Sequence, residues 1–415
     1  MGLYRFRPPA SGRMGILWTL STIRNAALVE FGSMGHMVYA RVALERMGVS
    51  GACGLYATHL NENDIALGST DRLLEAVRAV MEKDVPQALF LLPSSVPEII
   101  GTDLGALAKE LRGLYPKVPV MAFGKGGFHE DACHGVEEAL TVLARELALP
   151  PEQEQQAAWE HKAEPGTFNI IGSCADRFRF RAEAAELERL MRGAFGMKPQ
   201  CVMTAGASVD SLRTLGAASL NLAVRGEAVA AAELLQGSYG TPYVQGCPYG
   251  IEGTTRWLTQ VGEAIGCKPD AGFVGREAAE AKQAARLLTQ TVRYRKGKAR
   301  LFLGGPAESV TGISAFAREE LGMTVEAAWR DSLYGESDAV PFYTERQWME
   351  AAKAAEGAIL MASGQTLQWA GRPDTLQIAN PDLAWRINPH APPFAGYRGA
   401  LHLMELWANE MIREN

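Results

Sequence analysis

The stretch that decides the fold is AALVEFGSMGHMVYARVALERMGV, residues 26–49. It begins with an apolar, strand-like run, passes through a turn that contains Gly32 and Gly35, and ends in a run with apolar residues at helical spacing. Two later stretches repeat this order, TFNIIGSCADRFRFRAEAAELERLMRGAFGM at 167–197 and ARLFLGGPAESVTGISAFAREELGM at 299–323. Each copy predicts the opening strand, loop and helix of a parallel α/β domain.

Further strand candidates follow each repeat. They are the apolar runs at 88–95, 118–124, 219–224, 242–246 and 357–364. Apolar strands that alternate with amphipathic helices predict sheets covered on both faces. The predicted fold class is therefore α/β, with three doubly wound Rossmann-like domains whose sheets are mostly parallel. We expect these domains at 1–160, 161–295 and 296–415, joined by polar segments at 149–166 and 290–299. In such sheets, ligands bind beyond the carboxyl ends of the strands.

Composition limits the possible functions. The 415 residues carry a net charge of −6, which disfavours a nucleic-acid binder. No run reaches the roughly 18–20 apolar residues of a membrane span, and the N-terminus lacks the apolar core of a signal peptide, so we expect a cytoplasmic protein with no membrane partner. A P-loop and a G-x-G-x-x-G turn after a strand are both missing. The six cysteines form no C-x-x-C pair, which indicates that any metal cluster is not held by this chain alone.

Several predicted strand-end loops carry residues that can do chemistry. His36 stands in the first turn, Ser95 follows the run that starts at 88, and Cys174 and Cys247 end two further strands. The loop FGKGGFHEDACHG, residues 123–135, gathers potential metal ligands without an established spacing. Each of these residues also has an ordinary structural interpretation, as a turn histidine, a helix cap or a buried thiol. The residues alone leave both interpretations open.

Taken in order, the loops resemble those of the nitrogenase component 1 family over nearly the whole chain. The resemblance rests on LVEFGSMGHMVYARV, LFLLPSSVPEIIGTDL, FGKGGFHEDACHGVEEAL, FNIIGSCADRFRFRAEAAELERLM and INPHAPPFAGYRGALHLM. The family contains the nitrogenase molybdenum–iron protein subunits, their cofactor-assembly relatives and dark-operative protochlorophyllide reductase. It implies three Rossmann-like domains, assembly with a paralogous subunit, and electrons from a separate ATP-hydrolysing iron protein. ATP would then bind that partner and not this chain.

The resemblance also implies where a cofactor would be held. In the family, three cysteines anchor an iron–sulfur cluster at a subunit interface, and their positions correspond here to Ser11, His36 and Ser95. Hydroxyls are poor iron ligands, whereas imidazole ligates iron in some iron–sulfur centres. In the B-type subunit of dark-operative protochlorophyllide reductase, the same turn carries an aspartate ligand. We therefore interpret His36 as the metal ligand of a shared 4Fe-4S cluster, or as its neighbour, with three thiolates supplied by a cysteine-bearing paralogous subunit.

The expected function is that of a non-cofactor, B-type subunit of a nitrogenase-like reductase complex. Low-potential electrons would pass from the iron protein through the interfacial cluster to a reducible small molecule. Candidate proton donors are Cys174, Asp176, Cys247 and His390. Three further possibilities stay open: an inactive scaffold or cofactor-assembly subunit, a subunit that has lost its cluster, and a small-molecule receptor, which the missing signal peptide disfavours. The substrate is not specified by the sequence.

Overall fold

The computed structural model describes residues 10–49, 51–124, 131–148, 163–295, 297–335, 340–372, 376–380 and 392–412. Its strands form three four-stranded sheets. The strands are β1 (Ala26–Phe31), β2 (Gly54–Ala57), β3 (Ala88–Pro93), β4 (Val120–Ala122), β5 (Thr167–Ser173), β6 (Lys198–Thr204), β7 (Asn221–Ala223), β8 (Tyr243–Gln245), β9 (Arg300–Gly305), β10 (Thr324–Arg330), β11 (Ile359–Ser363) and β12 (Gln377–Ala379).

Helices connect the strands. They are α1 (Gly12–Leu20), α2 (Met34–Arg46), α3 (Glu62–Leu67), α4 (Asp71–Lys83), α5 (Ser95–Ile99), α6 (Leu104–Leu114), α7 (Ala132–Leu143), α9 (Phe180–Phe195), α10 (Val209–Arg213), α11 (Val229–Tyr239), α12 (Ile251–Ile265), α13 (Ala271–Tyr294), α14 (Ala307–Ala315), α15 (Glu345–Ala354), α16 (Gly364–Trp369) and α17 (Gly396–Ile412). Because α13 extends to Tyr294, the prediction of a second linker is wrong for residues 290–294.

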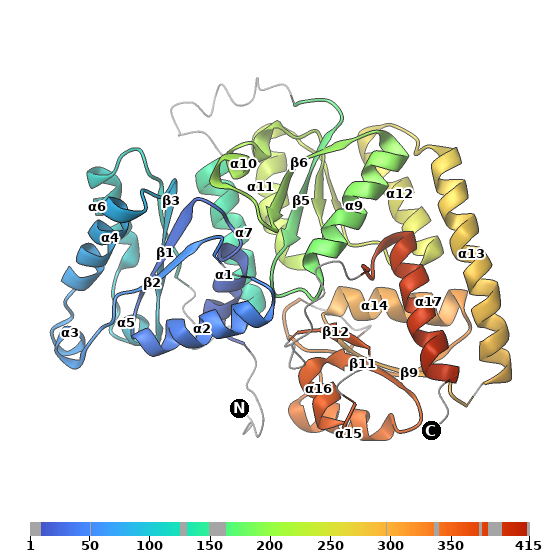
Figure 1. Ribbon diagram of the computed structural model, residues 1–415. Coiled ribbons are helices and arrows are strands. Elements are labelled where there is room, and N and C mark those ends of the chain that lie inside the picture. Colours follow the sequence, from blue (N-terminus) through green and yellow to red (C-terminus); the bar gives the residue numbers. More distant parts are fainter. Residues whose placement is uncertain are drawn as a thin grey trace. The chain divides into compact units, whose positions relative to one another are not determined.

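The first sheet shows why its strands are apolar on both sides. Its strand order is β2-β1-β3-β4, and the paired strands run parallel, with Phe31 opposite Pro93. Alternate residues of β1 enter different cores: Leu28 packs with α1 and α7, whereas Val29 packs with α4 and α6. Figure 1 shows these two pairs of helices on opposite faces of the sheet. A strand covered on both faces has no polar side, which explains the continuous apolar run in the sequence.

The other two sheets repeat this topology. Their strand orders are β6-β5-β7-β8 and β10-β9-β11-β12, so the opening strands β1, β5 and β9 occupy the same place in each sheet. These three strands begin the three sequence repeats, and the predicted fold class of three doubly wound, mostly parallel sheets is confirmed. The direction of strand order reverses between β1 and β3, between β5 and β7, and between β9 and β11. In doubly wound sheets, the carboxyl ends of the strands at such a switch point are the preferred place for ligands.

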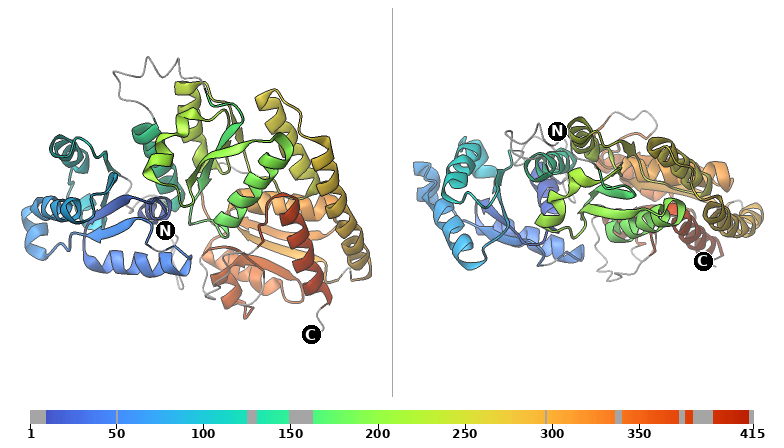
Figure 2. Two further views of the ribbon diagram at one scale, coloured as in Figure 1. Left: turned by 45° about the horizontal axis from the view of Figure 1, so that its top comes forward. Right: turned by 90° about the horizontal axis from the view of Figure 1, so that it is seen from above.

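The chain divides into two compact units, each described separately below. The N-terminal unit contains residues 10–176 and 199–243, and the C-terminal unit contains residues 177–198 and those from 244 onward. In the C-terminal unit, α13 and α17 run side by side, as Figures 1 and 2 both show. The bounds of the three domains drawn from the sequence stay a prediction. In the part of the chain that the structure describes, no helix combines the length and apolar character needed to cross a membrane.

Glycines let α1 and α7 approach closely within the N-terminal unit. A Cβ atom at Gly135 would lie 1.9 Å from the carbonyl oxygen of Gly12, and one at Gly15 would lie 1.9 Å from the carbonyl oxygen of Ala132. No side chain larger than hydrogen fits at either position without moving a backbone. The contact fixes the start of α1, and therefore Ser11, against the chain that follows β4.

Candidate functional site

The turn between β1 and α2 is built by a glycine in a confined place. The N–H of Gly32 donates to Oγ1 of Thr58 at 3.0 Å, and a Cβ atom at Gly32 would lie 2.4 Å from Oγ of Ser94. The turn therefore requires glycine here because the loop after β3 lies against it. Beyond the turn, His36 is the third residue of α2, and its side chain is exposed.

The loop after β3 is joined directly to the loop after β1. The N–H of Ser94 donates to the carbonyl oxygen of Phe31 at 2.9 Å. Ser94 itself is buried, and Ser95 follows as the partly buried first residue of α5. The loops that carry His36 and Ser95 thus meet at the switch point of the first sheet.

Ser11 precedes α1 as its N-cap residue and forms an antiparallel bridge with Asp131, which belongs to the chain that follows β4. The N–H of Ala132 also donates to the carbonyl oxygen of Ala10 at 2.9 Å. Ser11, His36 and Ser95 therefore belong to neighbouring segments at the carboxyl-terminal side of one sheet. The loops of His36 and Ser95 meet directly, Ser11 lies against the start of α7, and the described contacts include none between the three side chains.

The side chains at these three positions limit which metal centre they can bind. Two hydroxyls and one imidazole are a poor set for iron, which iron–sulfur proteins bind mainly through thiolates. Within the described ranges, no group of three or more His, Cys, Asp and Glu side chains lies close enough together to hold a metal ion. The residues therefore do not fit a cluster held by this chain alone. Of the three residues, only His36 has a side chain of a type that ligates iron in iron–sulfur centres.

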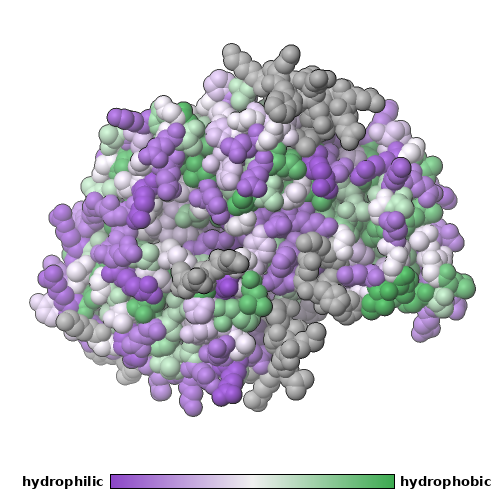
Figure 3. All heavy atoms as spheres, turned by 180° about the vertical axis from the view of Figure 1, so that it is seen from behind, coloured by the Kyte–Doolittle hydropathy of each residue, from purple (hydrophilic) through white to green (hydrophobic). Residues whose placement is uncertain are grey.

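Large apolar side chains are exposed around His36. On α2, Met34, Val38 and Tyr39 are each more than half exposed, and on the neighbouring α5 Ile99 is 70% exposed. Figure 3, a view from behind, shows a group of apolar residues at the lower right of that face. Contiguous exposed apolar side chains of this kind commonly mark a surface that contacts another macromolecule.

A buried ion pair lies behind the same loops, and the sequence did not reveal it. The Arg13 guanidinium on α1 donates to the carboxylate of Glu30 in β1. The Glu30 side chain has no exposed surface, and that of Arg13 is 9% exposed. The only signal in the sequence was a charged residue within an otherwise apolar strand.

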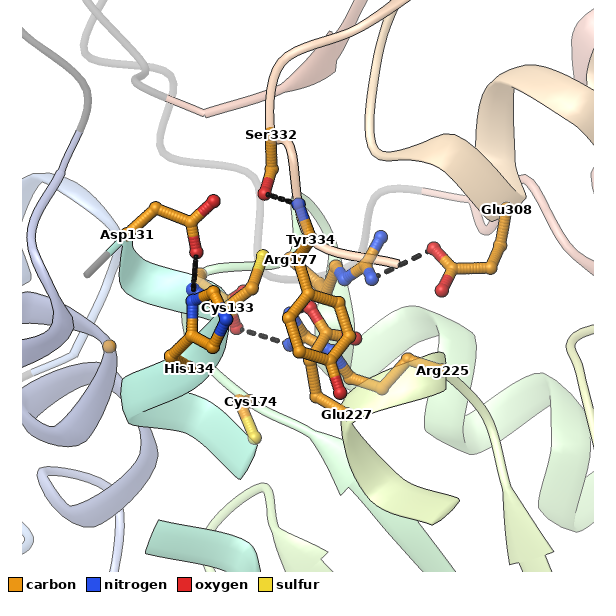
Figure 4. Close-up of polar contacts among 12 residues, drawn as sticks. Asp131, Cys133, His134, Cys174, Arg177, Arg225, Glu227, Glu308, Ser332 and Tyr334 are labelled. Atoms are coloured by element: carbon orange, nitrogen blue, oxygen red, sulfur yellow. Dashed lines mark hydrogen bonds and ion pairs between the residues drawn. The ribbon is translucent and has the colours of Figure 1, made fainter. Parts of the chain in front are cut away.

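Cys174 and Asp176 follow β5 in the N-terminal unit. The Cys174 thiol is buried and accepts a hydrogen bond from Oγ1 of Thr204 at 3.7 Å, and burial raises its pKa to about 11. Asp176 accepts a hydrogen bond from Nη1 of Arg225 at 2.8 Å. The Arg225 guanidinium also donates twice to Glu227, at 2.9 and 2.7 Å, and Figure 4 shows Arg225 and Glu227 together at this end of the sheet.

The loop that gathers potential metal ligands lies only partly within the described residues. His129 and Glu130 fall outside them. Asp131 caps α7 by accepting the N–H of Cys133 at 3.1 Å, and its Oδ1 also contacts Nδ1 of His134 at 3.1 Å, as drawn in Figure 4. Asp131 is thus a helix cap, and the described part of this loop forms no three-ligand metal site.

Cys247 lies in the loop between β8 and α12, in the C-terminal unit. Burial and the nearby Glu183 carboxylate raise the pKa of its thiol well above the usual value. The neighbouring Tyr249 hydroxyl shares a 2.9 Å hydrogen bond with Ser309, and Arg177 donates to Glu308 at 3.0 Å, a contact that Figure 4 also shows. His390, the fourth proton-donor candidate, lies outside the described residues.

Glu183 is a further titratable group that the sequence did not indicate. Its two carboxylate oxygens accept the backbone N–H groups of Phe394 at 2.7 Å and Ala395 at 3.0 Å. Burial raises the pKa of this carboxyl to about 7, although the two hydrogen bonds and Arg179 oppose the rise. Glu183 thus joins α9 to the segment that leads into α17, through a carboxyl group that titrates near neutrality.

We expect Glu183→Gln to flatten the pH dependence of stability. The Glu183 pKa is about 7 in the folded chain against an ordinary 4.5, so the folded chain binds this proton more tightly than the unfolded chain does. The stability from this group is therefore fully present below about pH 4.5 and lost as the pH rises through about 7. The loss amounts to at most about 3 kcal/mol.

The free energy of unfolding, measured by urea titration at several pH values between 4.5 and 8, checks this expectation. Glu263→Gln, which changes an exposed glutamate on α12, is the matched control and is expected to follow the wild type. A Glu183→Gln profile as steep as that of the wild type would contradict the assignment.

Comparison with known proteins agrees with this α/β architecture. A family model described as nitrogenase component 1 type oxidoreductase matches residues 11–412. The B-type subunit of the light-independent protochlorophyllide reductase of Methylobacterium radiotolerans is 30% identical over 272 residues, which cover 65% of this chain and 48% of that protein. The nitrogenase iron-molybdenum cofactor biosynthesis protein NifE of Klebsiella pneumoniae is 29% identical over 278 residues, covering 66% and 59%.

A solved structure described as nitrogenase Cp1 at pH 6.5 has the same fold. The TM-score is 0.79 at 16% identity, and the match covers 99% of this chain and 94% of that one. The fold is that of a doubly wound α/β protein. The match over residues 11–412 then shows that the chain belongs to the nitrogenase component 1 type oxidoreductase family. The chain spans about half the length of the first curated relatives it matches.

Proposed function

We propose that this chain is a non-cofactor subunit of a nitrogenase-like reductase complex. Low-potential electrons come from a separate ATP-hydrolysing iron protein and pass through a 4Fe-4S cluster shared with a cysteine-bearing paralogous subunit to a reducible small molecule. The proposal depends on one observation: an exposed imidazole, His36, stands at the β1–α2 turn of a chain that belongs to this family. The similarity to the B-type protochlorophyllide reductase subunit supports the choice of subunit type.

Two further observations support a shared site. The exposed apolar residues of α2 and α5 surround His36 and would be covered by a partner subunit. The cluster, when bound, would supply one-electron transfer, and this chain's part is to offer one imidazole ligand and to exclude water around it. Ser11 and Ser95 would then line the site as hydrogen-bonding neighbours. The proposal keeps the cytoplasmic location expected from the sequence.

Protons must accompany the electrons, and we retain Cys174, Asp176, Cys247 and His390 as candidate donors. The pKa of each described thiol is raised, to about 11 for Cys174 and well above the usual value for Cys247, with burial as the main cause. Both thiols therefore hold their protons at neutral pH and would act as acids, not as bases.

The test is the iron content and low-temperature EPR spectrum of the dithionite-reduced complex, purified anoxically through a tag on this chain. We expect about four irons per heterodimer, and we expect His36→Ala to lose the iron or to change the spectrum. His36→Cys, which restores a thiolate, is expected to keep the iron and lower the reduction potential, because imidazole ligands raise it.

His59→Ala is the matched control, since His59 is another exposed histidine and lies in the loop after the adjacent strand β2. It is expected to leave both iron content and spectrum unchanged. A complex without iron, or a spectrum indifferent to His36, would remove the proposed role of this chain in ligation.

A cofactor-assembly subunit is the second candidate, and the similarity to NifE favours it over a cluster-free subunit or a receptor. Such a subunit would carry a transferable metal cluster without turnover. An assay of the purified complex, supplied with the iron protein, ATP and dithionite, distinguishes a reductase subunit from a cofactor-assembly subunit. Sustained ATP-dependent oxidation of dithionite indicates a reductase, whereas transfer of the iron to an acceptor protein without turnover indicates assembly.

A further inference from the structure

The Arg13–Glu30 ion pair has features that packing alone does not require. It is buried, and beyond its single short contact neither Nη2 of Arg13 nor Oε2 of Glu30 has a hydrogen-bond partner among the described residues. A buried charged group with unused hydrogen-bonding atoms is costly, and apolar side chains of the same size would often be more stable. The pair therefore calls for an explanation beyond stability.

The place of the Arg13–Glu30 ion pair in the chain supplies such an explanation. Arg13 lies two residues after Ser11, at the start of α1. Glu30 is the penultimate residue of β1, just before the turn that leads to His36. A Cβ atom at Gly32 would lie 3.5 Å from Cγ of Glu30 and 2.4 Å from Oγ of Ser94, so the Glu30 side chain also borders the loop that carries Ser95.

We propose that the Arg13–Glu30 ion pair is a positioning element that holds the segments bearing Ser11, His36 and Ser95 in one arrangement. An ion pair between a guanidinium and a carboxylate has directional hydrogen bonds, which apolar contacts lack. It therefore fixes the rotation of α1 and its height against β1, where apolar packing would tolerate small shifts. Its significance rests on the proposed function, but the positioning is a property of this chain alone.

The test compares two buried glutamates of the N-terminal unit, both paired with arginine. Glu30→Gln removes the negative charge at nearly constant shape. Glu227→Gln does the same in the pair with Arg225, and the Glu227 side chain, at 2% exposed, is buried to a similar degree. Hydrogen–deuterium exchange is followed at the amides of Gly32, bonded to Thr58, and of Ser94, bonded to Phe31. We expect Glu30→Gln to speed exchange at these two amides by about tenfold relative to Glu227→Gln.

A second variant separates positioning from general destabilisation. In Arg13→Met/Glu30→Leu both charges are replaced by apolar groups, so no charge is left uncompensated and global stability is expected to recover. Positioning predicts that exchange at Gly32 and Ser94 stays fast in this double variant although the unfolding midpoint returns to near the wild-type value. Exchange that returns to the wild-type rate together with the midpoint would overturn the proposal.

The same double variant, assembled with the partner subunit, is then examined by EPR. A changed spectrum at unchanged iron content is the result expected if positioning serves the proposed cluster. If exchange is fast in the double variant but the wild-type complex contains no iron, the positioning role is kept and the cluster is rejected. The two proposals therefore fail separately.

Discussion

Replacing Gly135 by alanine is expected to destabilise the N-terminal unit by about 3 kcal/mol or more. The added Cβ atom would lie 1.9 Å from the carbonyl oxygen of Gly12, which belongs to the backbone of the facing helix and cannot rotate away. Either α1 and α7 separate, which opens a gap in the core between them, or α1 shifts along its axis and carries Ser11 with it. The corresponding fall in the midpoint of thermal unfolding is roughly 6–12 °C.

Differential scanning calorimetry of the full chain measures this effect, and Gly113→Ala provides the control. Gly113 lies in α6, is exposed, and has no neighbouring atom within 4 Å of an added Cβ. Alanine there is expected to leave the midpoint unchanged or to raise it slightly, because alanine favours helix. Equal midpoints for the two variants would show that α1 and α7 are not held at the distance described.

Arg225→Met is expected to cost about 3–5 kcal/mol. Arg225 is completely buried, and although burial alone lowers the pKa of its guanidinium, the carboxylates of Asp176 and Glu227 raise it well above the usual value. Methionine fills much of the same volume but removes the buried guanidinium charge with which both carboxylates pair. The cost arises chiefly from these two groups and not from lost packing.

The free energy of unfolding in urea measures this cost, with Arg213→Met as the control. Arg213 pairs with Asp210 at 3.3 Å, but its side chain is 44% exposed, so the change is expected to stay within about 0.5 kcal/mol. A second variant, Arg225→Met with Glu227→Leu, removes one of the stranded carboxylates and is expected to recover part of the loss. No recovery would show that lost packing around Arg225, and not stranded charge, sets the cost.

The fold could be predicted largely because its central strands are covered on both faces. β1, β3, β5 and β11 are buried along nearly their whole length and read as continuous apolar runs. The strands β2, β6, β10 and β12 were not predicted. β12 is a buried strand of only three residues, whereas β2, β6 and β10 all lie at the same edge of their sheets, beside β1, β5 and β9. Their residues are only partly buried, with Lys198 and Thr324 exposed, so neither an apolar run nor a clean alternation marks them.

The candidate site, like the fold, could be predicted from the sequence only in part. The loops that carry His36 and Ser95 could be placed together because parallel strands end at one edge of a sheet. The pairing of Arg13 with Glu30 could not, because it depends on how α1 lies against β1, and this is a tertiary arrangement to which the close glycine contacts between α1 and α7 contribute. The raised pKa of Glu183 likewise arises from tertiary burial, in a place where its carboxylate accepts the N–H of Phe394, more than 200 residues away along the chain.

The shared strand order of the three sheets makes their switch points directly comparable. In the second sheet, Arg225 after β7 reaches Asp176 after β5, so the chain's own side chains occupy the place where a ligand would bind. In the first sheet, the corresponding loops meet through a backbone hydrogen bond from Ser94 to Phe31, and His36 faces outward. One scaffold, used three times, thus joins its switch-point loops through a side-chain ion pair in the second sheet and through a backbone hydrogen bond in the first. A ligand of the second sheet would have to displace an internal ion pair, whereas one at the first would displace none of those described.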